Sequence, residues 1–378
     1  MTAAPAQIQA GLPVDYYMPD YQIEVRDHPL DQEARGDVID LKVTLVKDNI
    51  GSFQLTINNW DDKLLAFKYS DGDTFKLDNK IHVKLGYVDN MVSVMRGIVT
   101  SLTPQFPESG PPTLAVGCQD SLFVLKDKRP GEGAQKTFVD MYDWEIAQVV
   151  AQRNGLRFNA TREGPRHEQV VQRNLTEAQF LIERAKRIDF DCFIAVDPDS
   201  GRDTLNFVRR SDGRDGQSGR TYVFEWGKTL ISFSPTLALA NQVGSVTVRG
   251  WDARTRQAIT YTATRDDLPG LPTGAVSGPE AAASTAARQD VVVDRPVLST
   301  EEARHLAISL LRERARTFNT GSGQVIGLAD LRPGDEVDIR NVGTRFSGTY
   351  EVTKVDHSLG SAGFTTRFEV QQASAGES

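Results

Sequence analysis

The sequence is poor in cysteine, in basic clusters and in long apolar runs. Its only two cysteines, Cys118 and Cys192, lie among apolar residues and are interpreted as buried small side chains, so a disulfide scaffold is excluded. The 51 acidic residues outnumber the 43 basic ones, and no basic stripe suited to nucleic-acid phosphates is present. No apolar run approaches the ~20 residues that span a bilayer, and the N-terminus lacks the features of a signal peptide. These absences exclude a nucleic-acid binder and a membrane anchor, and they favour synthesis in a cytoplasm.

The dominant pattern is an alternation of apolar and polar residues, which is typical of half-buried β-strands. It runs from Tyr21 to about Leu125 and returns between Tyr222 and Val370. Turn formers separate the strands at short intervals, and this spacing favours a barrel or a sandwich over a parallel α/β sheet. The predicted fold class is therefore α+β and predominantly β, with two β-barrel-like domains and a small αβ domain between them.

Composition and clusters of turn-forming residues divide the chain into three parts. Residues 1–130 are predicted to form the first β-barrel-like domain with an N-terminal extension, and residues 131–215 the small αβ domain with two helices and a hairpin. Residues 216–378 are predicted to form the second β-barrel-like domain. Its stretch near residues 269–298 is rich in Pro, Gly, Ala and Ser, so we expect a flexible insertion there, followed by a helix near residues 300–317.

Helix start signals stand at two places. Thr176 and Gln179 have the spacing of a capping box, and an apolar stripe follows them. Ser299 and Glu302 form a second such pair. A further apolar stripe over Asp143–Arg153 predicts the other helix of the αβ domain.

Motifs that would support chemistry are incomplete. His167 begins a pattern like the H-E-x-x-H zinc motif, but Val171 replaces the second ligand, so a solvated turn or an edge strand is the favoured interpretation. Residues 197–203 resemble the start of a calcium loop that lacks its acidic twelfth position, where Val208 stands. The glycine-rich residues 321–327 fit no nucleotide motif and predict a helix C-cap and a flexible turn. The sequence therefore predicts no catalytic, cofactor-binding or metal-binding residues.

Four stretches of the sequence carry a family resemblance. They run from Tyr21 to Trp60, from Met95 to Asp120, from Gln172 to Ile188 and from Leu331 to Val370. In this order and spacing they resemble the late control gene D protein family of contractile phage tails. That family shares its hub module with the VgrG spike proteins of type VI secretion and of extracellular contractile injection systems.

The resemblance implies a structural baseplate hub and no enzyme. In such a hub, three copies each contribute two barrel-like tube domains, and this ring of six similar units joins a hexameric inner tube to a trimeric spike. The implied partners are the other copies in the homotrimer, the inner tube or a tube-initiator protein, a separate spike protein and other baseplate proteins. No cofactor is implied. The chain would be assembled in the bacterial cytoplasm into a virion tail or an injection-system particle, with the spike on another polypeptide.

Candidate anchors and two other functions follow from the same residues. Trp60, Phe106, Tyr350 and Phe364 are candidate interface anchors, although a core position is the favoured interpretation of each. A peptidoglycan-degrading tail-tip enzyme remains an alternative, because glycoside hydrolysis needs only two suitably placed carboxylates. A carbohydrate-binding tail module is the other alternative.

Overall fold

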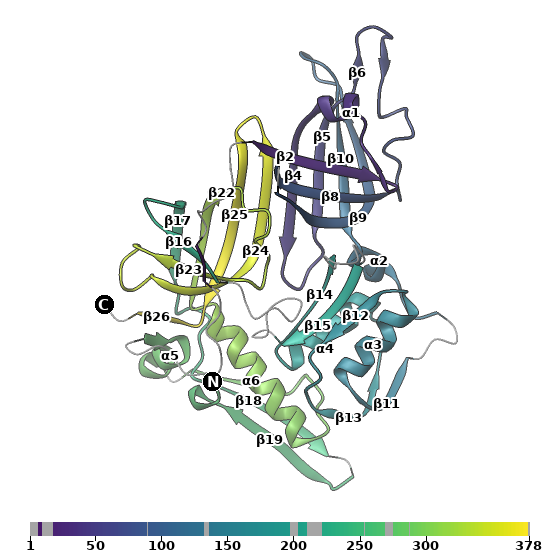
Figure 1. The fold of residues 1–378 in the computed structure, drawn as a ribbon. Coiled ribbons are helices and arrows are strands. Elements are labelled where there is room, and N and C mark those ends of the chain that lie inside the picture. The colour runs from purple at the N-terminus through teal and green to yellow at the C-terminus, as the bar shows by residue number, and fades with distance from the viewer. Residues whose placement is uncertain are drawn as a thin grey trace.

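The computed structural model describes residues 7–9, 18–88, 90–131, 136–196, 203–209, 221–252, 254–268, 275–286 and 288–376. Strands make up most of their regular structure, which confirms a predominantly β chain with helices. Figure 1 shows two β lobes side by side, with helices and smaller sheets beneath them. The incomplete calcium-like motif lies largely outside the described residues.

The first β lobe is formed by the N-terminal third of the chain. Its strands hydrogen-bond in the order β4-β5-β10-β9-β8-β2, and side chains such as Phe53, Leu55 and Val116 fill its core. These strands are β2 (Pro19–Val25), β4 (Val38–Val46), β5 (Ser52–Asn58), β8 (Lys80–Tyr87), β9 (Asn90–Gln105) and β10 (Thr113–Asp120). The shorter elements are β3 (His28–Pro29), α1 (Gln32–Asp37), β6 (Trp60–Asp61), β7 (Ala66–Phe67) and α2 (Leu122–Asp127).

The second β lobe is formed mainly by the C-terminal part of the chain. Its strands follow the order β17-β22-β25-β24-β23-β16, around a core that includes Phe224, Tyr350 and Phe368. They are β16 (Thr221–Glu225), β17 (Leu230–Leu237), β22 (Asn319–Ile326), β23 (Glu336–Arg340), β24 (Gly348–Gly360) and β25 (Gly363–Gln372). The short β1 (Gln7–Gln9) adds to β16 in parallel.

The two lobes repeat one strand order. Strands β4, β5, β10, β9 and β8 correspond in that order to β17, β22, β25, β24 and β23. The irregularities match as well: Ile39 and Ile231 are skipped in the pairing of β4 and β17, and Thr100 and Thr353 in that of β9 and β24. The sixth strand differs, since β2 runs antiparallel to β8 whereas β16 runs parallel to β23. Five strands therefore form a structural repeat.

Backbone hydrogen bonds outside the strands support the same correspondence. Val99 of β9 donates to Asn79 and accepts from Asp78, just before β8. Val352 of β24, its counterpart, donates to Asp335 and accepts from Gly334, just before β23. The repeat therefore extends to individual backbone contacts.

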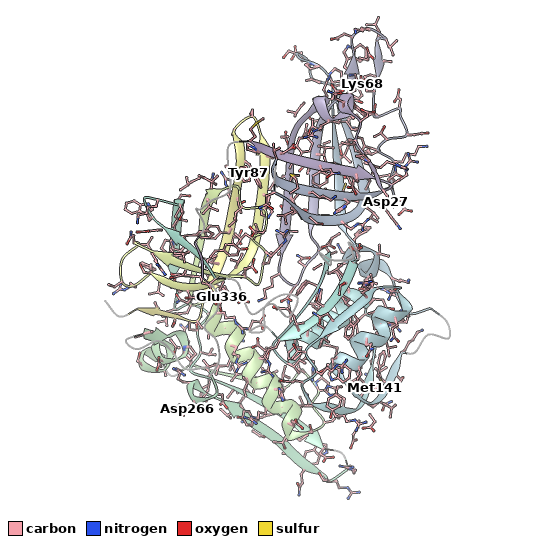
Figure 2. The ribbon with its side chains drawn as sticks, in the orientation of Figure 1. Asp27, Lys68, Tyr87, Met141, Asp266 and Glu336 are labelled. Carbon is pink, nitrogen blue, oxygen red and sulfur yellow. The ribbon has the colours of Figure 1, made fainter. Side chains whose placement is uncertain are left out.

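A seam of paired strands joins the lobes. β24 runs antiparallel to β4, with Lys354 opposite Val46 at one end and Leu359 opposite Leu41 at the other, so both lobes belong to one 14-stranded sheet. Tyr87, which Figure 2 labels between the lobes, donates its hydroxyl to the Gly327 carbonyl at 3.0 Å. This pairing holds the lobes in one orientation.

The αβ unit lies under the first lobe. Its helices are α3 (Asp143–Arg153) and α4 (Glu177–Arg187), and its strands are β11 (Thr137–Tyr142), β12 (Arg157–Ala160), β13 (Arg166–Val171), β14 (Phe190–Val196) and β15 (Asp203–Arg209). Both predicted helices and the β14–β15 hairpin are confirmed, together with the capping box of Thr176 and Gln179.

A fourth unit is inserted between β17 and β22. It contains β18 (Ser245–Asp252), β19 (Gln257–Ala263), a 3-10 turn (Arg265–Asp267), β20 (Ala275–Ser277), α5 (Gly278–Ala286), β21 (Gln289–Val292) and α6 (Thr300–Arg316), and β20 pairs with β26 (Ser374–Gly376). The sequence assigned β18 and β19 to the second barrel-like domain, but they form a separate sheet with its own core on α6. Alternation identifies a strand and not its sheet, and the apolar stripe of α6 needs a sheet to cover it.

The expected flexible insertion near residues 269–298 has regular structure in its described part, namely β20, α5 and β21. The glycine-rich residues after α6 also differ from the prediction, because they form the strand β22. A Cβ on Gly321 would lie 2.7 Å from the Phe233 ring, and one on Gly323 would lie 2.4 Å from the Phe368 ring. These glycines make room for two aromatic rings, so they serve core packing and not a turn.

Candidate assembly surfaces

Of the four candidate anchors, two are buried, Trp60 is half-buried and Phe106 is exposed. Tyr350 is fully buried, donates its hydroxyl to the Phe346 carbonyl at 2.7 Å, and has its pKa raised by burial to about 12. Phe364 is also buried and packs against Tyr87 with ring centres 5.8 Å apart. The core interpretation is confirmed for these two.

Trp60 and Phe106 lie instead at the far end of the first lobe. Phe106 is 63% exposed, and Phe67 lies between it and Trp60, with edge-to-face ring distances of 5.4 and 5.3 Å. Leu64 and Leu65, in the turn between β6 and β7, are 76% and 73% exposed. We call these five residues the tip cluster. Trp60 and Phe67 are half-buried, and the other three are exposed. Exposed apolar side chains gathered at one end of a lobe mark a candidate interaction surface.

Polar contacts fix the base of the β6–β7 hairpin. Asn59, fully buried, accepts hydrogen bonds from the backbone of Tyr69 and Ser70 at 2.9 and 3.0 Å. Lys68, labelled near this end in Figure 2, binds Asp37 and Glu33 at 2.9 Å each, and these contacts raise the pKa of Lys68. The apolar turn therefore projects from a well-anchored base.

The turn itself is held in a costly conformation. Asp61 accepts from the backbone N–H groups of Lys63 and Leu64 at 2.8 and 3.0 Å, and these bonds lower the pKa of Asp61. Leu65 follows with φ of +50°, in the left-handed region that favours glycine. An exposed leucine in a strained conformation has no evident structural use, which makes it a functional candidate.

A second apolar surface lies along the edge of the second lobe. We define the β17 edge patch as Trp226, Ile231, Leu237 and Ile326, which are 59%, 54%, 39% and 59% exposed. Strand β17 pairs with β22 on one side, and among the described residues its other side has a single bridge, between Trp226 and Leu230. Such an edge presents unpaired backbone groups beside apolar side chains.

A buried lysine joins the two lobes and the αβ unit. Lys47, at the end of β4, has a side chain only 8% exposed and binds both Asp191 of β14, at 3.1 Å, and Glu351 of β24. A buried charge that loses its partners is strongly destabilising. Lys47 therefore makes the relative placement of the three units specific.

A second ionic cluster joins the αβ unit to α6. His167 was expected in a solvated turn or an edge strand; it lies in strand β13 but is buried, 4% exposed. Its Nδ1 lies 2.5 Å from Glu302 Oε1, and its Nε2 lies 2.9 Å from Asp143 Oδ2. Arg184 donates to the other Asp143 oxygen at 2.5 Å. Each ring nitrogen therefore lies within hydrogen-bond distance of a carboxylate oxygen.

The opposite charges of this cluster reinforce one another, although Arg184, whose Nη2 lies 2.7 Å from His167 Nε2, disfavours the imidazolium. Burial opposes the imidazolium, but Asp143 and Glu302 outweigh it and raise the pKa of His167. Burial likewise opposes the carboxylates, yet Arg184 and His167 lower the pKa of Asp143. Ser299 is the N-cap of α6, as predicted, and its hydroxyl accepts from the Glu302 N–H at 3.1 Å. The Glu302 carboxylate does not complete the capping box on the Ser299 N–H; it accepts from Leu298 N–H and from His167 instead, because the buried ring needs a counter-charge.

The two cysteines are confirmed as buried apolar side chains. Both are unpaired, and burial raises the pKa of both thiols, to about 12 for Cys118. Within the part of the chain that the structure describes, no helix is long and apolar enough to cross a membrane.

Sequence reasoning found two members of the tip cluster and missed the others. Leu64, Leu65 and Phe67 stand in a turn between charged residues, and this unusual placement of apolar side chains was the available signal. It also missed β17, where Pro235 interrupts the alternation.

Solved structures with this fold are phage tail proteins and a secretion-system component. The 43 kDa tail protein of prophage MuSo2 from Shewanella oneidensis is 15% identical with a TM-score of 0.69, covering 94% of this chain and 98% of that chain. A Neisseria meningitidis tail protein is 13% identical with a TM-score of 0.67, covering 94% and 97%. An E. coli type VI secretion component, described as similar to T4 tail proteins gp27 and gp5, is 13% identical with a TM-score of 0.57, covering 92% and 76%.

The chain has the tail-protein fold over nearly its whole length. It belongs to the family described as the Alg8 N-terminal domain, whose model matches residues 18–361. No curated protein matches its sequence significantly.

Proposed function

We propose that this chain is a structural protein of the baseplate hub in a contractile phage tail or a phage-tail-like injection system. The observation that carries the proposal is the repeat of five strands in two lobes, joined into one sheet whose β17 edge has, among the described residues, no partner apart from one bridge. Two similar lobes in one chain suit a ring in which three copies supply six units. The tail-protein fold supports the same assignment.

In this proposal the two lobes are the barrel-like tube domains, and the homotrimer matches a hexameric inner tube on one side and a separate trimeric spike on the other. The tip cluster and the β17 edge patch are apolar surfaces that contacts with other copies or baseplate proteins would cover. The αβ unit braces the lobes through Lys47, and the His167 cluster joins the αβ unit to the α6 unit. The proposed place of the chain is the assembled particle.

The mass of the assembly tests this proposal. Light scattering and mass photometry of the purified chain should find a species of three times the 41.7 kDa chain mass at micromolar concentration. Co-expression with the candidate spike should give a complex of three chains with one spike trimer. A chain that stays monomeric in both experiments would contradict the hub assignment.

The enzyme alternative receives little support from the carboxyl groups. A glycosidase acid needs a raised pKa, whereas Arg184 and His167 lower that of buried Asp143, and His167 with the Leu298 backbone lowers that of Glu302. Turnover of purified peptidoglycan, abolished by neutralising one carboxylate, would restore this alternative.

A further inference from the structure

The three-stranded sheet of the α6 unit has one covered face and one open face. Its strands lie in the order β19-β18-β21, and Figure 1 shows β18 and β19 beneath α6 at the bottom of the molecule. Val246, Val248 and Ile259 are buried in the core that the sheet shares with α6. Side chains alternate between the two faces of a strand, so the residues between these positions form the opposite face. We define this open sheet face as Thr247, Arg249 and Trp251 of β18, Ala258, Thr260 and Thr262 of β19, and Gln289 and Val291 of β21.

The open sheet face is accessible to solvent but carries almost no charge. Trp251 is 58% exposed and Val291 is 48% exposed, and Val293, two residues further along the chain, is 69% exposed. Of the eight members of the face, Arg249 alone is charged. An antiparallel sheet with one face in water normally has polar and charged side chains on that face. A face of β-branched and aromatic side chains is instead typical of an interaction surface.

The charge of Arg249 has no counter-charge in the described part of the chain. Arg249 is exposed, it lies opposite Thr260 in the sheet, and its side chain forms no ion pair or hydrogen bond with any described residue. A protein surface that covers Arg249 has to supply a carboxylate, because a buried guanidinium without a counter-charge is strongly destabilising. The planar guanidinium binds such a group with two parallel hydrogen bonds.

We propose that the open sheet face binds a second baseplate protein through an apolar surface that places an aspartate or glutamate side chain against Arg249. The inference rests on the proposed function, which puts the chain in a baseplate, and it adds a binding surface and the chemistry of the partner. Trp251 and Val291 flank the ion pair and exclude water from it, as the surroundings of a strongly binding interface residue do.

A second copy of this chain fits the open sheet face poorly. Two such faces packed on each other would enclose two Arg249 side chains and no carboxylate. Acidic side chains, Asp62 and Glu108, do adjoin the tip cluster in the sequence, but the tip lies at the opposite end of the molecule in Figure 1. Contacts between opposite ends of successive copies produce a filament and not the closed ring of the proposed function.

A polysaccharide fits the face less well than a protein does. Thr247 and Thr262 offer hydroxyl groups, which are hydrogen-bonded to each other at 2.9 Å. The aliphatic Val291 and Val293, however, have no group that could bond to a sugar hydroxyl. Trp251 is the one aromatic ring of the face. The composition of the face therefore favours a protein partner.

Coupling an introduced amine to the carboxylate of the partner tests the ion pair. Arg249→Lys keeps the positive charge, and a water-soluble carbodiimide joins a lysine amine to a contacting carboxylate, with loss of one water molecule. Particles assembled with this variant should give an amide between residue 249 and an acidic residue of another baseplate protein, identified by mass spectrometry of proteolytic peptides. The matched control is Arg256→Lys, an exposed position in the turn of the same hairpin, which should give at least tenfold less product.

The reactivity of an introduced cysteine tests whether the face is covered. The native Cys118 and Cys192 are buried, so a maleimide should label the introduced thiol. Thr260→Cys should react at least tenfold more slowly in assembled particles than in the purified chain. Gln257→Cys is the control, because Gln257 is exposed on the same strand but lies on the side of Ile259, and it should react equally in both. Unchanged circular dichroism melts verify that each variant folds.

The outcomes separate the inference from the proposed function. Protection of Thr260→Cys in particles alone, together with the amide at residue 249, supports the inference. Equal labelling in particles and purified chain, protection already present in the purified chain, or protection without the amide overturns it. Slower labelling of the purified chain in the presence of peptidoglycan fragments also overturns it, because the ligand is then a sugar. The hub assignment stands in all these cases if the purified chain is a trimer and is present in particles. A chain that is monomeric and absent from particles counts against both.

Discussion

The two β lobes share a strand order but fill their cores in opposite ways. In the first lobe, β5 supplies the large side chains Phe53 and Leu55, and Val116 on β10 is smaller. In the second lobe, the matching positions of β22 are Gly321 and Gly323, and the large rings come from Phe233 and Phe368. At the Leu55 and Val116 positions the large and the small residue have exchanged strands, since Gly323 and Phe368 occupy these positions in the second lobe. One architecture therefore tolerates either arrangement, provided that the total volume is kept.

The lobes differ equally in what covers their edges. The β4 edge of the first lobe is covered by β24 of the same chain, whereas the β17 edge of the second lobe is open among the described residues apart from one bridge. The same strand position is thus part of the interior in one lobe and of the surface in the other. Substitutions in the seam and on the open edge measure this difference.

The largest expected effect comes from a seam leucine. Leu41 is 1% exposed, so Leu41→Ala should lower the free energy of unfolding by about 3 kcal/mol in urea denaturation. Leu237, on the open β17 edge, is 39% exposed, and Leu237→Ala should cost the monomer less than about 1 kcal/mol. Equal losses of unfolding free energy in the two variants would show that the seam leucine is no more buried in solution than the leucine of the open edge.

A buried histidine in the seam should make stability depend on pH. Burial lowers the pKa of His357 to about 3, whereas the unfolded chain has the usual value of 6.5. Because the folded pKa is the lower one, the free energy of unfolding falls as the pH drops below 6.5, by roughly 3 kcal/mol at about pH 4. His357→Gln should remove this slope in thermal melts recorded across that pH range.

The matched control for this experiment is an exposed histidine of the first lobe. His28→Gln changes the same side chain at an exposed position and should leave the slope unchanged. If His357→Gln has the wild-type slope, the acid sensitivity of the chain comes from other groups.

The exchanged core volumes can be tested by making the second lobe resemble the first. Gly323→Leu places a side chain where a Cβ already lies 2.4 Å from the Phe368 ring, so it should destabilise the chain by about 2 to 3 kcal/mol. Adding Phe368→Val copies the Leu55 and Val116 pair of the first lobe and should recover a large part of the loss. A double-mutant cycle in urea measures this coupling, and simple additivity of the two losses would argue against the correspondence.

The smallest expected effect on stability concerns the β6–β7 hairpin of the first lobe. Leu65 has φ of +50°, so Leu65→Gly should raise the free energy of unfolding by about 0.5 kcal/mol or leave it unchanged, because relief of strain is partly offset by the entropy of glycine. The same variant should weaken co-purification with baseplate proteins. Unaltered binding would remove Leu65 from the tip cluster as a functional residue.

The elements with local signals were predictable from the sequence. The capping box at Thr176 and the stripe that follows it lead directly to α4, and the alternation around Val43 leads to β4. β22 was not predictable, because Gly321 and Gly323 suggest a turn until the rings of Phe233 and Phe368 are placed against them. The exposure of individual side chains could not be predicted either. Nothing in the sequence distinguishes Phe106 from Phe364, and only the fold shows that Phe106 is exposed and Phe364 is buried.

The sequence by itself determined those strands and helices that have a local signal, because periodicity and capping act over a few neighbouring residues. The tertiary structure alone decided which strands meet. Thr44 and Asp356 are 312 positions apart and touch across the seam, and β18 lies in a different sheet from β17 although they are near neighbours in the chain. Strand pairing depends on distant edges that match in register and burial, and that information is distributed over the whole chain.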